Sequence, residues 1–406
     1  MARRLIAHLD MDAFYASVEL LRYADLRGEP VVIGGGRDHA PHVMPDGTRR
    51  YARLRSYVGR GVITTATYAA RAFGVNSGLG LMKAAALAPE AVLLPVDFDE
   101  YRRYSRLFKA AVRAIAPLVE DRGIDEIYVD VSVLPGAQLD GGRAAGRALK
   151  DAVFAATGLT CSVGVTPNKL LSKMCSEFDK PDGLTLLTEA EIPARIWPLP
   201  ARKINGIGPK ASARLDALGI HSIGELATAS PALLVAEFGK SQGAWLHAAA
   251  HGRDDRPLVM ASEPKSISRE TTFERDLHAV RDRAALTALL NELCLALAGD
   301  LARKGYASRT IGIKLRFDDF RIVTRDLTLP AHTMDARSIR RAAGECQKRV
   351  DLTRRLRLLG VRAGALARLA DLVGPPHAAE PMRPPVANEP AAHYGLPLFD
   401  SLPPGV

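Results

Sequence analysis

The strongest constraint on the fold is the alternation of short strands and helices over the first 190 residues. Short runs rich in apolar and β-branched residues, at 4–9, 30–35, 61–66, 91–96, 126–132 and 161–166, read as strands. Segments with helical spacing of apolar residues lie among them, at 11–22, 80–88, 99–116 and 141–156. This mixture predicts an α+β domain in which helices cover a sheet.

The pattern changes near residue 190. Residues 188–250 contain no convincing strand and read as short helices separated by glycine turns. Strands return at 265–273, 309–329 and 354–366, with helices at 280–304 and 335–350 between them. These segments predict a second, smaller α+β domain. A chain of 406 residues is long enough for several such units, so we expect a multidomain α+β protein.

Charge and composition narrow the class of protein. The net charge is +10, and residues 263–371 hold 22 Lys and Arg against 14 Asp and Glu. A basic domain of this kind favours a polyanionic partner. The sequence has no long apolar run and no apolar signal core at its N-terminus, so we expect a cytoplasmic protein without a membrane segment. Its four widely spaced cysteines indicate neither zinc nor disulfides.

Two pairs of acids stand at the ends of predicted strands. Asp10 and Asp12 close the first strand, and Asp125 and Glu126 open the strand at 126–132. Rigid backbone at such positions can aim carboxylates at one point, and carboxylates are natural ligands for Mg²⁺. Two divalent ions held in this way can clamp the attacking and leaving oxygens of a phosphoryl transfer. Each pair taken alone is more typical of solvated surface acids than of a metal site.

Four segments carry a family resemblance. LDMDAFYASVE (9–19), VITTATYAARAFGV (62–75), GIDEIYVDV (123–131) and CSVGVTPNKLLSKMCSEFDKPDG (161–183) resemble, in order and spacing, the motifs of Y-family DNA polymerases. The resemblance continues through the glycines near 206 and the basic C-terminal domain. It departs at Gly123, where the family usually has a serine two places before the Asp-Glu pair, and at Ala72, where a basic residue is usual.

The resemblance implies a right-hand polymerase with a ferredoxin-like palm, small fingers, a helical thumb with a helix-hairpin-helix and an α+β little finger. Set on this sequence, the palm would be 1–13 and 93–187, the fingers 14–92, the thumb 188–252, a linker 253–262, the little finger 263–373 and a disordered tail 374–406. The implied reaction is template-directed addition of deoxynucleotides to a primer 3′ end. Low fidelity, translesion synthesis in damage tolerance and the absence of a proofreading exonuclease are implied with it.

The metal site is also implied by the resemblance. Asp10, Asp125 and Glu126, with the carbonyl of Met11, would hold two Mg²⁺ ions, and Glu126 would lie near the primer 3′ hydroxyl. Asp12 matches the family pattern, and we expect its carboxylate to be structural.

The nucleotide pocket is implied on the fingers side. Tyr15 matches the steric gate, whose flat ring would exclude a ribose 2′-OH; its alternative is a core aromatic. The implied contacts to the nucleotide are Phe14, Thr65, Tyr68, Arg71 and Lys180.

The DNA contacts are implied in the thumb and little finger. Gly206 and Gly208 would free backbone N–H groups for a DNA phosphate, with Lys210 beside them. The candidate phosphate contacts of the basic domain are Lys265, Arg269, Lys314, Arg316 and Arg325, of which we expect about half to matter.

Two segments of the sequence each allow two functional interpretations. The terminal LPLFD resembles a sliding-clamp peptide, with Leu396, Leu398 and Phe399 as its anchors, although Gly395 stands in place of the usual Gln; the alternative is a tail that binds nothing. The arginine-rich segment 37–60 is longer than the family's usual turn. It reads as a loop or ribbon, and a solvated loop is favoured over a contact to the template strand.

Two other functions compete with a monomeric polymerase. A non-catalytic DNA-binding scaffold would have no need of three aimed carboxylates at Asp10, Asp125 and Glu126. A metal-dependent nuclease would have no need of the triphosphate-binding residues Tyr68 and Arg71.

Overall fold

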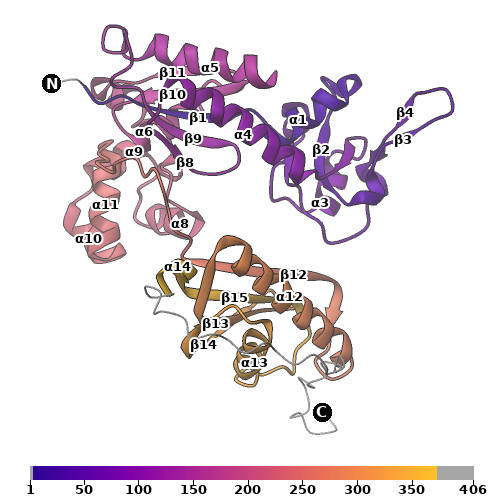
Figure 1. Cartoon of the computed structure of the whole chain (residues 1–406). Coiled ribbons are helices and arrows are strands. Elements are labelled where there is room, and N and C mark those ends of the chain that lie inside the picture. The colour runs from indigo at the N-terminus through magenta and orange to yellow at the C-terminus, as the bar shows by residue number, and fades with distance from the viewer. Residues whose placement is uncertain (1–2, 373–406) are drawn as a thin grey trace, which may run out of the picture. The chain divides into compact units, whose positions relative to one another are not determined.

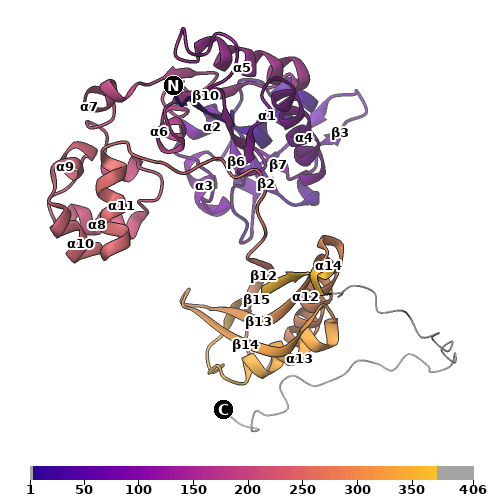
Figure 2. The same ribbon diagram turned by 60° about the vertical axis from the view of Figure 1, so that its left-hand side comes forward.

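The computed structural model describes residues 3–372, and the chain divides after Ser262 into two compact units (Figures 1 and 2). Each unit has its own hydrophobic core and both mix helices with sheets, as the sequence predicts.

A five-stranded sheet forms the centre of the first unit. Its strand order is β11 (Leu184–Leu186), β10 (Cys161–Thr166), β1 (Ile6–Met11), β9 (Glu126–Asp130) and β8 (Val119–Asp121). The central strand β1 runs antiparallel to both β10 and β9.

The two faces of this sheet carry different side chains. Odd-numbered residues of β1, β9 and β10, such as Leu9, Ile127 and Val163, join the core under helices α4 (Phe98–Ile115) and α5 (Arg143–Thr157). The even-numbered residues lie on the opposite face, against helix α6 (Lys169–Cys175). Gly164 permits this close approach, because a Cβ there would lie 2.3 Å from the carbonyl oxygen of Ser172.

A second sheet of the first unit belongs to the segment predicted as fingers. Its order is β5 (Ala52–Arg53), β7 (Val92–Pro95), β2 (Val31–Gly35) and β6 (Thr65–Ala66), with β2 and β7 parallel. Helices α1 (Phe14–Arg22), α2 (Tyr68–Arg71) and α3 (Leu81–Leu87) surround it. Strand β7 extends this sheet to Pro95, past the predicted palm boundary at 93.

The arginine-rich segment forms a ribbon. Strands β3 (His42–Val43) and β4 (Arg49–Arg50) pair in a hairpin that projects from the second sheet (Figure 1). Residues 42–50 are all exposed, so the hairpin tip adds nothing to the core. The chain then returns as β5, which pairs with β7.

Helices fill the segment predicted as thumb. They are α7 (Ile192–Arg195), α8 (Pro209–Ala217), α9 (Ile223–Thr228), α10 (Pro231–Phe238) and α11 (Lys240–Ala250). Their apolar side chains form a core with Leu171 and Met174 of α6, which ties this helical segment to the sheet.

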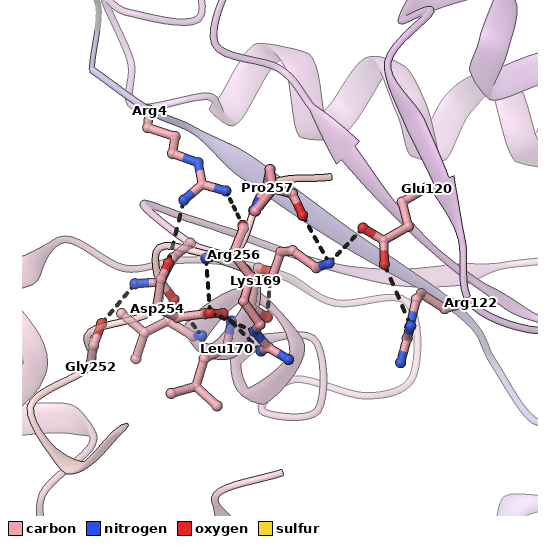
Figure 3. Close-up of polar contacts among 12 residues, drawn as sticks. Arg4, Glu120, Arg122, Lys169, Leu170, Gly252, Asp254, Arg256 and Pro257 are labelled. Atoms are coloured by element: carbon pink, nitrogen blue, oxygen red, sulfur yellow. Dashed lines mark hydrogen bonds and ion pairs between the residues drawn. The ribbon is translucent and has the colours of Figure 1, made fainter. Parts of the chain in front are cut away.

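The chain beyond α11 is fastened to the first sheet by polar contacts (Figure 3). Lys169 of α6 pairs with Glu120 at 2.5 Å, and the two side chains are only 6% and 2% exposed. Lys169 also donates to the carbonyl oxygen of Pro257, and the N–H of Val259 donates to Glu120. Asp254 accepts a hydrogen bond from the N–H of Leu170. The predicted linker 253–262 therefore belongs to the first unit.

The second unit is a four-stranded antiparallel sheet with helices on one face. The order is β12 (Ser266–Leu277), β15 (Leu356–Arg368), β13 (Tyr306–Phe317) and β14 (Ile322–Thr333). Helices α12 (Arg283–Lys304) and α13 (Ala336–Gln347) pack on it, and the short α14 (Leu369–Leu372) follows. Buried residues of β13 such as Ile311, Ile313 and Leu315 point to the helices. The other face carries polar side chains.

Helix α12 is, by length and composition, apolar enough to cross a membrane, and it is the one such helix within residues 3–372. In this unit it serves as a core helix, since Leu286, Leu290 and Leu297 are buried among the side chains of the sheet and α13.

Candidate active site

Asp10 and Glu126 lie on the α6 face of the five-stranded sheet, and Asp125 comes immediately before β9. Asp10 and Glu126 stand directly opposite each other in the β1–β9 ladder. The N–H of Met11 donates to the carbonyl oxygen of Asp125 at 3.0 Å, so Asp125 begins this pairing. Two sequence segments more than a hundred residues apart thus supply three neighbouring carboxylates.

Asp10 is held by a lysine. Its side chain is 17% exposed, and Lys180 lies 2.6 Å from Oδ1. Burial raises the pKa of Asp10, and the nearby Lys180 opposes that rise. The same ammonium group pairs with Glu177 at 2.6 Å, so Lys180 bridges two acids at the edge of the site.

The pKa values of Asp125 and Glu126 are shifted in opposite directions. Burial and the charge of Glu126 raise the pKa of Asp125. The neighbouring His8 ring and Lys173, whose ammonium contacts Glu126 Oε2, lower the pKa of Glu126 to about 2. Glu126 is therefore ionised at neutral pH. The negative charge of Glu126 makes ionisation of the neighbouring Asp125 less favourable.

Asp12 is occupied by structural hydrogen bonds. Only 2% exposed, it accepts from Ser162 Oγ at 2.7 Å and from the N–H of Asp182 at 2.8 Å. The hydroxyl of Tyr68 lies 3.4 Å from its Oδ1. Both carboxylate oxygens already have protein donors, which favours the structural role expected for this residue.

The ring of Tyr15 is held in place by two other aromatic rings. Its ring stacks on Tyr101 with centroids 4.2 Å apart and planes inclined by 12°, and Phe98 packs against it edge-on. The Tyr101 hydroxyl donates to buried Glu19 at 2.7 Å, and this hydrogen bond fixes the Tyr101 ring. Phe14 points elsewhere: it is 3% exposed and packs edge-on against Phe108 in the core.

Three of the predicted triphosphate residues lie in β6 and α2. Thr65 is buried in β6. Tyr68 and Arg71 lie on one side of α2, and the Arg71 guanidinium is 4.9 Å from the centre of the Tyr68 ring. Arg71 Nε donates to the carbonyl oxygen of Ala66 at 3.1 Å, which fixes its direction. Burial and the charge of Asp12 raise the pKa of Tyr68 to about 12, so its hydroxyl stays a donor at neutral pH.

This donor set suits hard divalent cations. Ligand atoms of Asp10 and Glu126, with a nitrogen of His8, lie within 4.8 Å of one another. The raised pKa values of Asp10 and Asp125 are the mark of carboxylates packed together in a poorly solvated place. Oxygen ligands of this kind are those that Mg²⁺ and Mn²⁺ prefer.

Gly206 and Gly208 lie in the turn before α8 and differ in backbone conformation. Gly206 has φ of 116°, and a Cβ there would lie 2.7 Å from the Trp245 ring, so no other residue fits easily. Gly208 caps α8, and Lys210 is exposed in its first turn.

The basic residues of the second unit divide between the two faces of its sheet. Lys314 and Arg316 have the parity of the uncovered face, where Lys314 pairs with Glu270 at 2.8 Å. Arg269 instead points to the helix side, where it pairs with Asp300 of α12 at 2.5 Å. Arg325 likewise bonds the backbone near the end of α13, through the carbonyl oxygen of Arg349. Lys265 is exposed just before β12.

Several residues of the site were not predicted. His8, Lys173 and Ser162 contact the acids, and Arg362 lies on the uncovered face of the second unit. The available signals were their spacing from predicted residues: His8 is two before Asp10 on one strand, and Lys173 lies on the helix that precedes Lys180. The proposed clamp anchors Leu396, Leu398 and Phe399 lie outside the described residues.

Comparison with known proteins supports one family over most of the chain. Residues 9–177 match the impB/mucB/samB family, residues 264–372 match the C-terminal domain of that family, and residues 202–254 match the thumb domain of DNA polymerase-iota. A protein named DNA polymerase IV from Methanoculleus marisnigri is 38% identical over 363 residues, covering 89% of this chain and 94% of the relative. Another of that name from Halorhodospira halophila is 36% identical over 369 residues, covering 90% of this chain and 96% of the relative.

A solved structure has the same fold. The "Y-family DNA polymerase chimera Dbh-Dpo4(243-245)-Dbh" superposes with a TM-score of 0.73 at 24% identity, covering 89% of this chain and 98% of that one. Taken with the sequence relatives, which match over nearly their whole length, this fold leaves one assignment: the protein belongs to the impB/mucB/samB family, the Y-family DNA polymerases.

Proposed function

We propose that this protein copies primed template DNA by adding deoxynucleotides to the primer 3′ end, with Asp10, Asp125 and Glu126 as the ligands of two Mg²⁺ ions. It is a DNA-directed DNA polymerase of the low-fidelity, translesion type, by its family. The observation that carries the site assignment is the cross-strand placement of Asp10 opposite Glu126, with Asp125 beside them.

The chemistry divides between the metal and the chain. When bound, the ions would neutralise the triphosphate and activate the primer hydroxyl. Asp10, Asp125, Glu126 and the Met11 carbonyl would hold them. Tyr68, Arg71 and Lys180 would bind phosphate oxygens, since a guanidinium can do so through two parallel hydrogen bonds. Their proximity to Asp12 and Asp10 supports this role.

Sugar selection would belong to Tyr15. The stack on Tyr101 leaves its ring little freedom to move aside, which suits a residue that must reject a 2′-OH. Thr65 is a proposed neighbour of the nucleotide. Phe14, expected there from the sequence, is buried in the core and would act only through the packing of the helix that carries Tyr15.

Duplex DNA would be held by sequence-independent contacts. Gly206, Gly208 and Lys210 would bind one backbone phosphate, and the uncovered face of the second unit would present Lys314 and Arg316 to others. Lys265, which is exposed just before β12, remains a candidate of the same kind, whereas Arg269 and Arg325 are engaged on the helix side of the sheet. Docking of the C-terminal LPLFD peptide in a sliding clamp, a monomeric state and a cytoplasmic location are further proposals from the sequence.

The deciding experiment is primer extension with Mg²⁺ and four deoxynucleotides. Wild type should extend the primer, and Asp125→Ala should lose far more activity than the ~10–100-fold typical of disturbing groups behind a metal ligand. Asp151→Ala, which removes an exposed carboxylate on α5, is the matched control and should behave as wild type. A wild type that binds primed DNA without extending it would favour the scaffold function, and one that shortens the primer would favour a nuclease.

A further inference from the structure

A buried lysine lies behind the turn that carries Lys180. Lys150 lies on the face of α5 that packs on the five-stranded sheet, and its side chain is only 4% exposed. Its ammonium group donates to the carbonyl oxygen of Cys161 at 2.6 Å, to the carbonyl oxygen of Asp182 at 2.7 Å and to Oδ1 of Asp182 at 2.5 Å. An ammonium group has three N–H donors, so these three acceptors use all of them.

The same turn, residues 180–183, is also bound through its backbone N–H groups. The N–H of Asp182 donates to Oδ2 of Asp12 at 2.8 Å, and the N–H of Gly183 donates to Ser162 Oγ at 3.2 Å. Ser162 in turn donates its hydroxyl hydrogen to Asp12. The turn is therefore held by Asp12 and Ser162 at its N–H groups and by Lys150 at a carbonyl oxygen and a carboxylate.

Asp182 has a backbone conformation that needs support. Its φ of 60° lies in the left-handed region, which is uncommon for residues other than glycine. Lys150 binds both the carbonyl oxygen and the carboxylate of this residue, so one ammonium group holds the conformation at two points. The third acceptor belongs to Cys161, which pairs with Met11 across the β1–β10 ladder. Lys150 thus fixes the turn relative to the strand end at the proposed metal site.

Lys180 depends on this turn because its own side chain is flexible. A lysine has a four-carbon stem with rotatable bonds, so the protein can fix only the place of its backbone before a nucleotide binds. In the structure the ammonium of Lys180 pairs with Asp10 and Glu177, each at 2.6 Å. To bind a triphosphate it would turn away from these acids, and the turn that ends at Gly183 sets how far it reaches.

We propose that Lys150 is a positioning residue that, by holding Asp182, fixes the turn from which Lys180 reaches the triphosphate of the incoming nucleotide. This inference rests on the proposed function, in which Lys180 binds phosphate oxygens. It gives Lys150 and Asp182, which lie outside the proposed site residues, a role in nucleotide affinity and none in the chemical step.

The first test is Lys150→Met, which keeps much of the stem and removes the three donors. The Kd for a deoxynucleotide is measured by fluorescence titration on a dideoxy-terminated primer, which cannot be extended, and KM and kcat are measured on an extendable primer. Kd and KM should both rise by roughly 10-fold, within the ~100-fold loss that a misplaced group can cause, with a smaller change in kcat. Arg147→Met, which removes a charge from the exposed side of the same helix, is the control and should behave as wild type.

A double variant separates positioning of Lys180 from a general loss of structure. If Lys150 acts through Lys180, Lys150→Met should change Kd little in a protein that already carries Lys180→Met, because the contact it supports is absent there. Additive defects in the double variant would overturn the proposal. Wild-type affinity in Lys150→Met alone would overturn it as well.

Two substitutions of Asp182 keep the proposal testable if thermal melting shows that Lys150→Met does not fold. The Asp182 carboxylate is 59% exposed, so replacing it leaves the core intact. Asp182→Gly permits the left-handed conformation but removes the acceptor, and should raise Kd. Asp182→Asn keeps an acceptor oxygen in the same place and should stay near wild type. Equal affinities in these two variants would overturn the proposal.

Failure of this proposal and failure of the proposed function give different results. If Lys180→Met binds the deoxynucleotide as tightly as wild type does, the role of Lys150 is overturned, although primer extension by the wild type still supports a polymerase. If the wild type binds the deoxynucleotide but extends no primer, the proposed function fails, whereas the differences in Kd among the variants still measure the role of Lys150.

Discussion

The carboxylate of Asp125 is held where its own negative charge is unfavourable. Burial and the neighbouring Glu126 raise its pKa, so the folded state favours the protonated form more than the unfolded state does. The ionised form present at neutral pH therefore costs stability until a cation arrives. Function and stability conflict at this residue, as is common at active sites.

Asp125→Asn should accordingly stabilise the metal-free protein while abolishing extension. At pH 7 we expect the thermal midpoint to rise by roughly 2–4 °C, which corresponds to about 1 kcal/mol for a unit of this size. Because the wild-type carboxyl becomes neutral as the pH falls through its raised pKa, the difference should shrink on acidification. Melting curves of both proteins in chelator at pH 7 and at acid pH test this. Asp151→Asn is the control, and an equal rise in that variant would contradict the account.

Tyr15 offers a second test at the residue scale. Tyr15→Ala removes the ring that is stacked on Tyr101, and ribonucleotide incorporation should rise by roughly tenfold or more, a change of ~1.4 kcal/mol in the barrier. Deoxynucleotide addition should continue. Tyr15→Phe keeps the ring and should keep the selectivity. Single-nucleotide incorporation assays with paired ribo- and deoxynucleotides measure this, and unchanged selectivity in Tyr15→Ala would remove Tyr15 from the role.

The sequence could identify the acids but not the groups around them. Asp10 and Asp125 stand at strand ends, which the alternation pattern places, and the family resemblance supplies their role. His8 gave no such signal, because a histidine on a strand is also typical of a core. Its contact with Ser176 depends on how α6 crosses the sheet, and that crossing depends on the close approach at Gly164.

At the scale of elements, the contact of α6 with strand β8 and the following linker uses a buried charge pair. Lys169 and Glu120 are nearly inaccessible, and Lys169 also donates to the carbonyl oxygen of Pro257 (Figure 3). Glu120 also accepts a hydrogen bond from the N–H of Val259. A buried pair of this kind is weak evidence for stability as a whole, but loss of one partner leaves an uncompensated charge.

Lys169→Met should therefore destabilise the first unit by about 3–5 kcal/mol. The double variant Lys169→Met with Glu120→Met should recover part of that loss, because no buried charge remains. Denaturant unfolding of the single and double variants measures both values. A single variant as stable as wild type would show that solvent reaches Glu120.

Strand and helix positions were predicted well because their patterns are local. The strands at 4–9 and 126–132 and the helix at 99–116 each have a clear period, and they correspond to β1, β9 and α4. The face to which a strand residue points was not predictable, since it depends on which side the helices cover. Arg269 and Arg316 both alternate on strands, yet Arg269 pairs with α12 and Arg316 has the parity of the uncovered face.

At the scale of the whole molecule, the positive charge predicts how DNA binding depends on salt. Most of the excess charge lies in residues 263–371, which form the second unit. Each neutralised phosphate releases condensed counterions, so the logarithm of the affinity should fall with log salt at about 0.9 per contact, and five contacts would give a slope of about −4.5. A salt-independent affinity would exclude the electrostatic role of this unit.

The two faces of the sheet allow that slope to be divided among residues. Arg316→Ala, on the uncovered face, should weaken binding to all DNA sequences alike and reduce the magnitude of the salt slope by about 1. Arg269→Ala should leave the slope unchanged, because its guanidinium is engaged by Asp300, and should instead lower the stability of the second unit by about 1–2 kcal/mol. Fluorescence anisotropy over a salt series, with thermal melting of both variants, separates the two effects. If Arg269→Ala lowers the slope as much as Arg316→Ala does, DNA reaches the helix side of the sheet, and the uncovered face loses its special role.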